Sequence, residues 1–161
     1  MDSETRVELT QLPELILIGH SFRTSPAAQR QPGEIPAFWD DFFHSGRHGR
    51  LPEAAIPGVL VACCYDEGED GSFSYLIGAP VRADQQPSGD QERLELPAVR
   101  YARTTARGLM AQAIPATFQW LHRQWLPSSG LEPASGPELE WYDHRVSCGA
   151  DAEVDLFVPV R

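Results

Sequence analysis

LELPAVRYARTTARG, residues 94–108, has the branched and aromatic composition of a β-strand, and it restarts an order of elements already present earlier in the chain. The next segment, residues 109–126, predicts a helix with one apolar stripe formed by Met110, Ile114, Phe118, Leu121 and Trp125. Two strand-like runs follow, ELEWYDHRV (138–146) and AEVDLFVPV (152–160). This half of the chain therefore predicts the order β-α-β-β.

The first half predicts the same order. Residues 15–22 (LILIGHSF) indicate a strand, and residues 35–46 (IPAFWDDFFHSG) indicate a short helix with a proline in its first turn. The runs 58–67 and 72–81 are separated by turn residues, which is typical of an antiparallel hairpin. Residues 83–92 are polar and contain Pro and Gly, so we expect them to connect the two halves.

The repetition is also visible in the letters, because IPAFW at 35–39 corresponds to IPATF at 114–118. We predict one α+β domain over residues 1–161, with internal repeats of about 5–82 and 93–161. The repeats are expected to be related by a pseudo-twofold axis, each with antiparallel strands and a helix. A groove between such halves is a favoured place for a small ligand.

Composition excludes several classes of function. The 161 residues carry 13 basic and 23 acidic side chains, a net charge of −10, so direct binding to nucleic acid is disfavoured and cationic partners are favoured. All basic residues are arginine, which removes Schiff-base lysine chemistry and the Walker phosphate loop. No run approaches the roughly 20 apolar residues of a membrane span, and MDSETRVE does not begin a signal peptide. We expect a cytoplasmic protein with no membrane partner.

No cofactor or metal site is expected. His44 and His48 have a spacing that would suit a metal on a helix, but Gly46 interrupts that helix and no third ligand follows.

Two acids and two aromatic rings are candidates for a shared binding surface. Alternation places Glu140 and Tyr142 on one face of their strand; if Trp141 packs under the helix, they point to the opposite side, where the groove would lie. In the partner strand, Glu153 and Phe157 lie opposite the apolar residues, so the four side chains could converge. A carboxylate among rings attracts a lipophilic cation, with cation–π contacts of about 0.5–2 kcal/mol each. The plainer alternative is that both glutamates lie on a solvated face of the hairpin.

The chain resembles the GyrI-like ligand-binding domain family. The resemblance spans nearly the whole chain and depends on the order of LELPAVRYA, Gly108, a Trp-containing helix ending in WLPSSG, GPELEWYD and the terminal EVDLFVPV. This domain forms the effector-binding half of multidrug-responsive and AraC-type transcription regulators, and it also occurs alone in gyrase-inhibitor-like proteins. The resemblance implies a duplicated β-α-β-β fold with an aromatic groove.

The resemblance also assigns roles to individual residues. It implies that Glu140 faces bound cations and that Glu153 is a second acidic residue near the ligand. Tyr101 follows the family's strand pattern and is expected to line the groove. The remaining candidate walls are aromatic, namely Trp39, Trp120 and Tyr75. For each of these aromatic residues, packing in the core is the alternative.

Arg103 departs from the family pattern, which more often has an apolar residue there. It lies two residues after Tyr101 and so on the same strand face, where it could pair with Glu140 or Glu153. Such a pair would weaken cation binding and favour a neutral or zwitterionic ligand.

These features predict a stand-alone module that binds a small aromatic, cationic molecule, as a sensor, a sequestering protein or a resistance factor. One alternative is a hydrolase that opens the strained cyclopropane rings of DNA-alkylating natural products, with Glu140 and Tyr142 in acid–base roles. Another is a gyrase-inhibitor-like module that binds a protein partner through its acidic surface.

Overall fold

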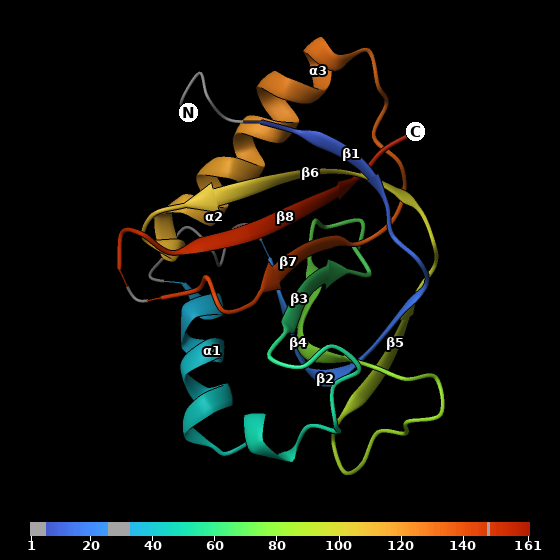
Figure 1. The fold of residues 1–161 in the computed structure, drawn as a ribbon, viewed down its shortest axis with the longest axis vertical. Helices are drawn as coiled ribbons and strands as arrows, with labels where there is room; N and C mark the ends of the chain where they lie inside the picture. The colour runs from blue at the N-terminus through green and yellow to red at the C-terminus, as the bar shows by residue number, and fades with distance from the viewer. Residues whose placement is uncertain (1–5, 26–32, 148) are drawn as a thin grey trace. The chain divides into compact units, whose positions relative to one another are not determined.

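The computed structural model describes residues 6–25, 33–147 and 149–161, and the chain divides into two compact units. One unit contains residues 15–96, and the other contains residues 1–14 and 97–161. Each is built from antiparallel strands and one main helix (Figure 1), so the predicted α+β class is confirmed.

The unit of residues 15–96 has the predicted β-α-β-β order. Its elements are β2 (Leu15–Thr24), α1 (Glu34–His44), the short 3₁₀ helix His48–Arg50, β3 (Leu60–Tyr65), β4 (Phe73–Val81) and a further strand, β5 (Glu92–Leu96). The strands lie in the order β3-β4-β2-β5. Pro36 stands in the first turn of α1, where its missing N–H has no helical partner to lose, and Gly46 follows the helix at φ +81°.

The other unit repeats this plan. Its elements are β1 (Glu8–Gln11), β6 (Arg100–Arg107), α2 (Met110–Trp120), a π-helical turn (Leu121–Trp125), α3 (Leu126–Ser129), β7 (Glu138–Tyr142) and β8 (Glu153–Pro159). The strands lie in the order β1-β6-β8-β7. Helix α2 packs on β6 and β8 (Figure 1), where Met110, Ile114 and Phe118 cover Ala106, Val154 and Leu156. The predicted apolar stripe is therefore the sheet-facing side of α2.

The boundaries of the units differ from the predicted repeats of 5–82 and 93–161. The predicted strand 94–108 is two strands, because β5 ends at Leu96 and β6 begins at Arg100, and the two belong to different units. Pro97 explains the break, since it has no N–H to donate to a strand ladder. Likewise β1, which precedes the first predicted strand, pairs with β6 of the second repeat.

Backbones approach closely at one point of the sheet of residues 15–96. Gly19 of β2 stands opposite Gly78 of β4, and a Cβ atom built on Gly19 would lie 1.9 Å from the carbonyl oxygen of Ile77. Only glycine fits here without displacing the neighbouring strand.

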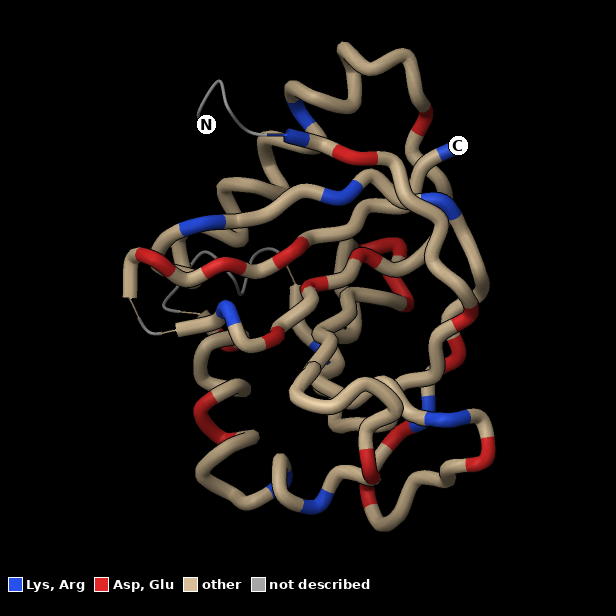
Figure 2. Tube along the Cα trace, in the orientation of Figure 1, with Lys and Arg blue, Asp and Glu red and all other residues tan. Residues whose placement is uncertain are grey.

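Acidic residues outnumber basic residues along the chain, and Figure 2 shows them in both units. Four of them occupy the turn between β3 and β4: Asp66, Glu67, Glu69 and Asp70. None of the described helices is long and apolar enough to cross a membrane.

Candidate functional site

Glu140 and Tyr142 lie on the helix-facing side of β7. The register pairs Glu140 with Leu156 of β8, and opposed residues of antiparallel strands point to the same face. Leu156 belongs to the cluster covered by α2, and the ring of Tyr142 packs against that same cluster. The candidate carboxylate therefore stands on the helix-covered face of the sheet.

The Glu140 side chain is buried, with the residue only 6% exposed. The Tyr142 hydroxyl donates a hydrogen bond of 2.5 Å to Glu140 Oε1. Burial removes most of the water that would screen a carboxylate, so a positive charge beside it is attracted more strongly than at the surface. The hydrogen bond also restricts the orientation of the carboxylate, since both partners are on one strand.

Glu153 and Phe157 lie on the opposite face, so the predicted convergence with Glu140 and Tyr142 is wrong. The register pairs Phe157 with Leu139 and Arg103, and it pairs Glu153 with Arg107. These residues alternate with Glu140 and its partner Leu156, so their side chains point to the opposite face of the sheet. The expectation that Trp141 packs under the helix is wrong for the same reason, because Trp141 pairs with Asp155 on the face away from α2.

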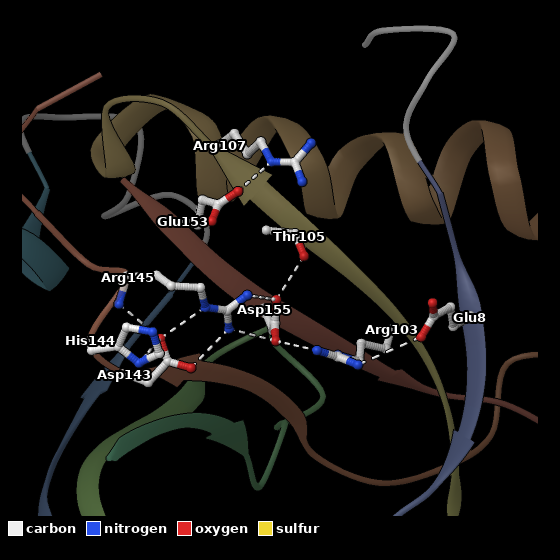
Figure 3. Close-up of polar contacts among 9 residues, drawn as sticks. All are labelled: Glu8, Arg103, Thr105, Arg107, Asp143, His144, Arg145, Glu153 and Asp155. Atoms are coloured by element: carbon white, nitrogen blue, oxygen red, sulfur yellow. Dashed lines mark hydrogen bonds and ion pairs between the residues drawn. The ribbon is translucent and has the colours of Figure 1, made fainter. Parts of the chain in front are cut away.

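A charged network centred on Asp155 occupies this second face (Figure 3). The side chain of Asp155 is 4% exposed and accepts hydrogen bonds from Arg103 at 2.7 Å, Thr105 Oγ1 at 2.7 Å and both terminal nitrogens of Arg145 at 3.1 and 2.7 Å. Arg145 also contacts Asp143, with two bonds of 2.9 Å. The charges of the network are thus compensated within it.

The partners of Asp155 and Asp143 in this network lower the pKa values of both carboxyl groups. Burial raises the pKa of Asp155, but the hydrogen bonds from Arg145, Arg103 and Thr105 outweigh it and leave that pKa below its ordinary value. The hydrogen bond from Arg145 likewise lowers the pKa of Asp143. Both carboxyl groups are therefore ionised at neutral pH.

Arg103 pairs with neither Glu140 nor Glu153, so both of its predicted partners are wrong. Its guanidinium group contacts Asp155 and lies 3.6 Å from Glu8, and it also lies 6.0 Å from the centre of the Phe157 ring. Glu153 instead contacts Arg107 at 2.6 Å. The register keeps Arg103 on the face away from Glu140, and on the shared face it places Glu153 opposite Arg107 and not opposite Arg103.

Tyr101 is a fully buried residue of this second face. It is 1% exposed, and its ring meets Phe157 edge to face with centroids 5.8 Å apart. The ring of Trp141 also lies near Phe157, with centroids 6.2 Å apart. Tyr101 and Phe157 therefore share an aromatic cluster, but on the face that Glu140 does not occupy.

Two of the remaining predicted wall residues contact each other in the unit of residues 15–96. Trp39 of α1 donates a hydrogen bond of 2.9 Å from its indole nitrogen to the Tyr75 hydroxyl of β4. Phe22 and Phe38 surround the Tyr75 ring, with centroids 6.2 and 6.4 Å from it. An aromatic surface thus covers the α1 side of this sheet. Trp120, the last predicted wall residue, is half-buried at the end of α2.

Sequence reasoning missed one further pair beside the candidate carboxylate. His122, in the π-helical turn after α2, approaches Glu138 with 2.5 Å between Nε2 and Oε2. The contact with Glu138 raises the pKa of His122 above its ordinary value, although burial opposes it. Alternation along β7 was the available signal, since Glu138, Glu140 and Tyr142 are two residues apart. Among the described residues no group of three or more His, Cys, Asp or Glu is placed to hold a metal ion.

Comparison with known proteins identifies a relative in sequence. The chain is similar to the transcriptional regulator BrlR of Pseudomonas aeruginosa, at 30% identity over 132 residues, which covers 80% of this chain and 47% of BrlR. It therefore spans about half the length of that relative.

Solved structures share the architecture. SAV2435 bound to tetraphenylphosphonium superposes with a TM-score of 0.78 at 20% identity, covering 97% of this chain and 94% of SAV2435. A protein of Listeria innocua described as a hydrolase gives a TM-score of 0.56 at 13% identity, covering 97% of this chain and 92% of the other.

The predicted resemblance to GyrI-like effector-binding domains is confirmed. A family model described as "Cass2: Integron-associated effector binding protein" matches residues 8–160, nearly the whole chain. The chain therefore belongs to the Cass2 family of integron-associated effector-binding proteins.

Proposed function

We propose that this protein binds aromatic, positively charged small molecules and that the carboxylate of Glu140 supplies their counter-charge. The observation that carries the proposal is the burial of this carboxylate on the helix-covered face of β7, next to the ring of Tyr142. Burying a charged group is costly, so a buried carboxylate is a candidate functional group.

The distribution of the arginines supports a cationic ligand. Arg103 was the residue whose charge could have opposed a cation, and its guanidinium group is engaged by Asp155 and Glu8 on the other face. Glu140 is therefore not neutralised by Arg103. The net charge of −10 also raises the concentration of cations near the protein.

The comparisons support the same ligand class. The chain belongs to an effector-binding family, and a protein of the same fold has been solved with tetraphenylphosphonium, a lipophilic cation. BrlR is named a transcriptional regulator. We therefore propose a sensor role, in which ligand binding by this module is passed on to transcription, with sequestration or resistance as variants of the same binding activity.

Calorimetric titration with tetraphenylphosphonium tests the proposal, using triphenylphosphine oxide as an uncharged probe of similar shape. The variant Glu140→Gln keeps an acceptor for the Tyr142 hydroxyl but removes the charge. We expect it to bind the cation about tenfold or more weakly, which corresponds to roughly 1.4 kcal/mol, and to bind the uncharged probe as before.

Glu153→Gln is the matched control, because Glu153 is an acid of the neighbouring strand on the opposite face. It should leave cation affinity within about twofold of the wild type. Equal cation affinity in wild type and Glu140→Gln would refute the role of Glu140.

A hydrolase remains a second candidate, favoured by the contact between Glu140 and Tyr142. A carboxylate and a phenol within hydrogen-bond distance can act together as acid and base. The Listeria innocua neighbour shows only that the fold is shared with a protein described as a hydrolase. Incubation with a cyclopropane-containing alkylating natural product distinguishes the two functions, since an enzyme releases many equivalents of ring-opened product and a binder protects at most one.

A further inference from the structure

Glu138 places a second carboxylate on the strand face that carries Glu140. Side chains two residues apart in a strand point the same way, and their Cα atoms are separated by about 6.5–7 Å. The contact of Glu138 with His122, from the segment following α2, confirms that Glu138 also faces the helix. The helix-facing side of β7 is therefore lined in sequence by Glu138, Glu140 and Tyr142.

The two carboxylates differ in their access to water. Glu140 is buried, whereas the side chains of Glu138 and His122 are 29% and 39% exposed. Glu140 thus places a carboxylate inside the face, and Glu138 places a second one nearer its rim. Two negative charges in line, one deep and one near the rim, match a ligand that carries two positive charges along one axis.

His122 decides whether Glu138 presents a net charge. When the imidazole is protonated, its contact with Glu138 is an ion pair and the pair is neutral. When it is deprotonated, Glu138 keeps an uncompensated negative charge. Within this unit, the neighbouring helix-facing residues of β6 and β8 are uncharged: Ala102, Thr104, Leu156 and Val158. Arg123 follows His122 on the same helical turn, and β7 contributes Glu138 and Glu140.

We propose that Glu138 is a specificity-determining residue of the cation site, selecting dicationic over monocationic aromatic ligands, and that His122 controls this selection by gaining or losing a proton. The proposal rests on the proposed function of Glu140. It extends that function by naming a ligand class and the side chains that choose it.

Two probes of matched shape test the proposal. Methyl viologen is a flat dication with one charge on each ring, and N-methyl-4-phenylpyridinium is the corresponding monocation. The measured quantity is the ratio of their dissociation constants by calorimetry at pH 5.5 and pH 9. The contact with Glu138 raises the pKa of His122 above its ordinary value, so the protonated form dominates at pH 5.5 and is lost as the pH rises toward 9.

We expect the wild type to prefer the dication about three- to tenfold more strongly at pH 9 than at pH 5.5, from one charge acting over about 7 Å. Glu138→Gln should lose the additional preference for the dication that the wild type has at pH 9. His122→Gln should prefer the dication as strongly at pH 5.5 as at pH 9, because no imidazolium forms to neutralise Glu138. A preference that is the same in wild type and Glu138→Gln at pH 9 would overturn the assignment, as would a pH dependence that survives in His122→Gln.

A reference titration with tetraphenylphosphonium separates this proposal from the proposed function. If the wild type does not bind the cation, or if Glu140→Gln binds it equally well, both proposals fail. If binding depends on Glu140 but the preference for the dication is unchanged in Glu138→Gln and His122→Gln, only the selection by Glu138 is wrong.

Discussion

Replacing Asp155 by Asn should destabilise the protein strongly without affecting cation binding. The variant keeps the shape of the side chain but removes the charge that Arg145, Arg103 and Thr105 surround. Breaking a buried ion pair typically costs about 3–5 kcal/mol. Arg145 keeps its contacts with Asp143, and Arg103 keeps Glu8, so the loss should be nearer 2–3 kcal/mol.

Urea unfolding followed by tryptophan fluorescence measures this loss, because Trp141 lies in the aromatic cluster of the same face. A thermal midpoint lowered by about 5–10 °C is the equivalent result for a chain of this length. Glu153→Gln is the control on the same strand. Its side chain is 30% exposed and its partner Arg107 is 71% exposed, so we expect a change below about 1 kcal/mol.

The difference in unfolding free energy between wild type and Asp155→Asn should depend on pH in a definite direction. The pKa of Asp155 is lower in the folded protein than its ordinary value of 3.8, so its stabilisation is present above pH 3.8 and is lost as the pH falls through the folded pKa. The gap between wild type and Asp155→Asn should therefore be constant from pH 7 to pH 5 and should narrow below pH 4. A loss under 1 kcal/mol at pH 7, or one equal to that of Glu153→Gln, would refute the assigned role of the network.

Two further changes have clear expected outcomes in the unit of residues 15–96. Gly19→Ala should cost about 3 kcal/mol or more, because the new Cβ would overlap the β4 backbone, whereas Gly49→Ala meets nothing within 4 Å and should change the urea midpoint little. Burial lowers the pKa of His20 below 6.5, so the unfolded chain takes up this proton first and the contribution of His20 to stability falls as the pH drops below about 7. His20→Leu removes this contribution, so between pH 7 and pH 5 it should lose less stability than the wild type; an unchanged pH dependence would contradict the reasoning.

Periodicity was sufficient to predict the main helix and the hairpin strands of each repeat. The stripe from Met110 to Phe118 has one sheet-facing side, and the hairpin of β3 and β4 is bounded by turn residues, so both segments carry an unambiguous local signal. The exchange of short strands between repeats was not predictable in the same way. β1 and β5 are only four and five residues long, and their partners are distant in sequence.

The faces of β7 could not be assigned from its sequence. Trp141 is a large aromatic residue that would be expected to face the helix, yet Glu140 is the residue that lies on that side. Alternation of apolar and polar residues identifies the core face only when the other face meets water. Here neighbouring residues of both faces are buried, with Leu139 at 0% and Glu140 at 6% exposure. The ten-residue connection between β7 and β8 leaves the register open, and a shift of one residue would exchange the faces.

The register of β7 and β8 also separates two electrostatic tasks. On one face, Asp155 is surrounded by donors that hold it ionised, so its charge contributes to stability and is not available to a ligand. On the other face, Glu140 accepts a hydrogen bond from the Tyr142 hydroxyl, and we propose that its carboxylate attracts the cation. We therefore expect substitutions at Glu138 or Glu140 to change ligand binding without disturbing the arginine network. This separation is the physical reason to expect that binding and stability respond to different residues of the same hairpin.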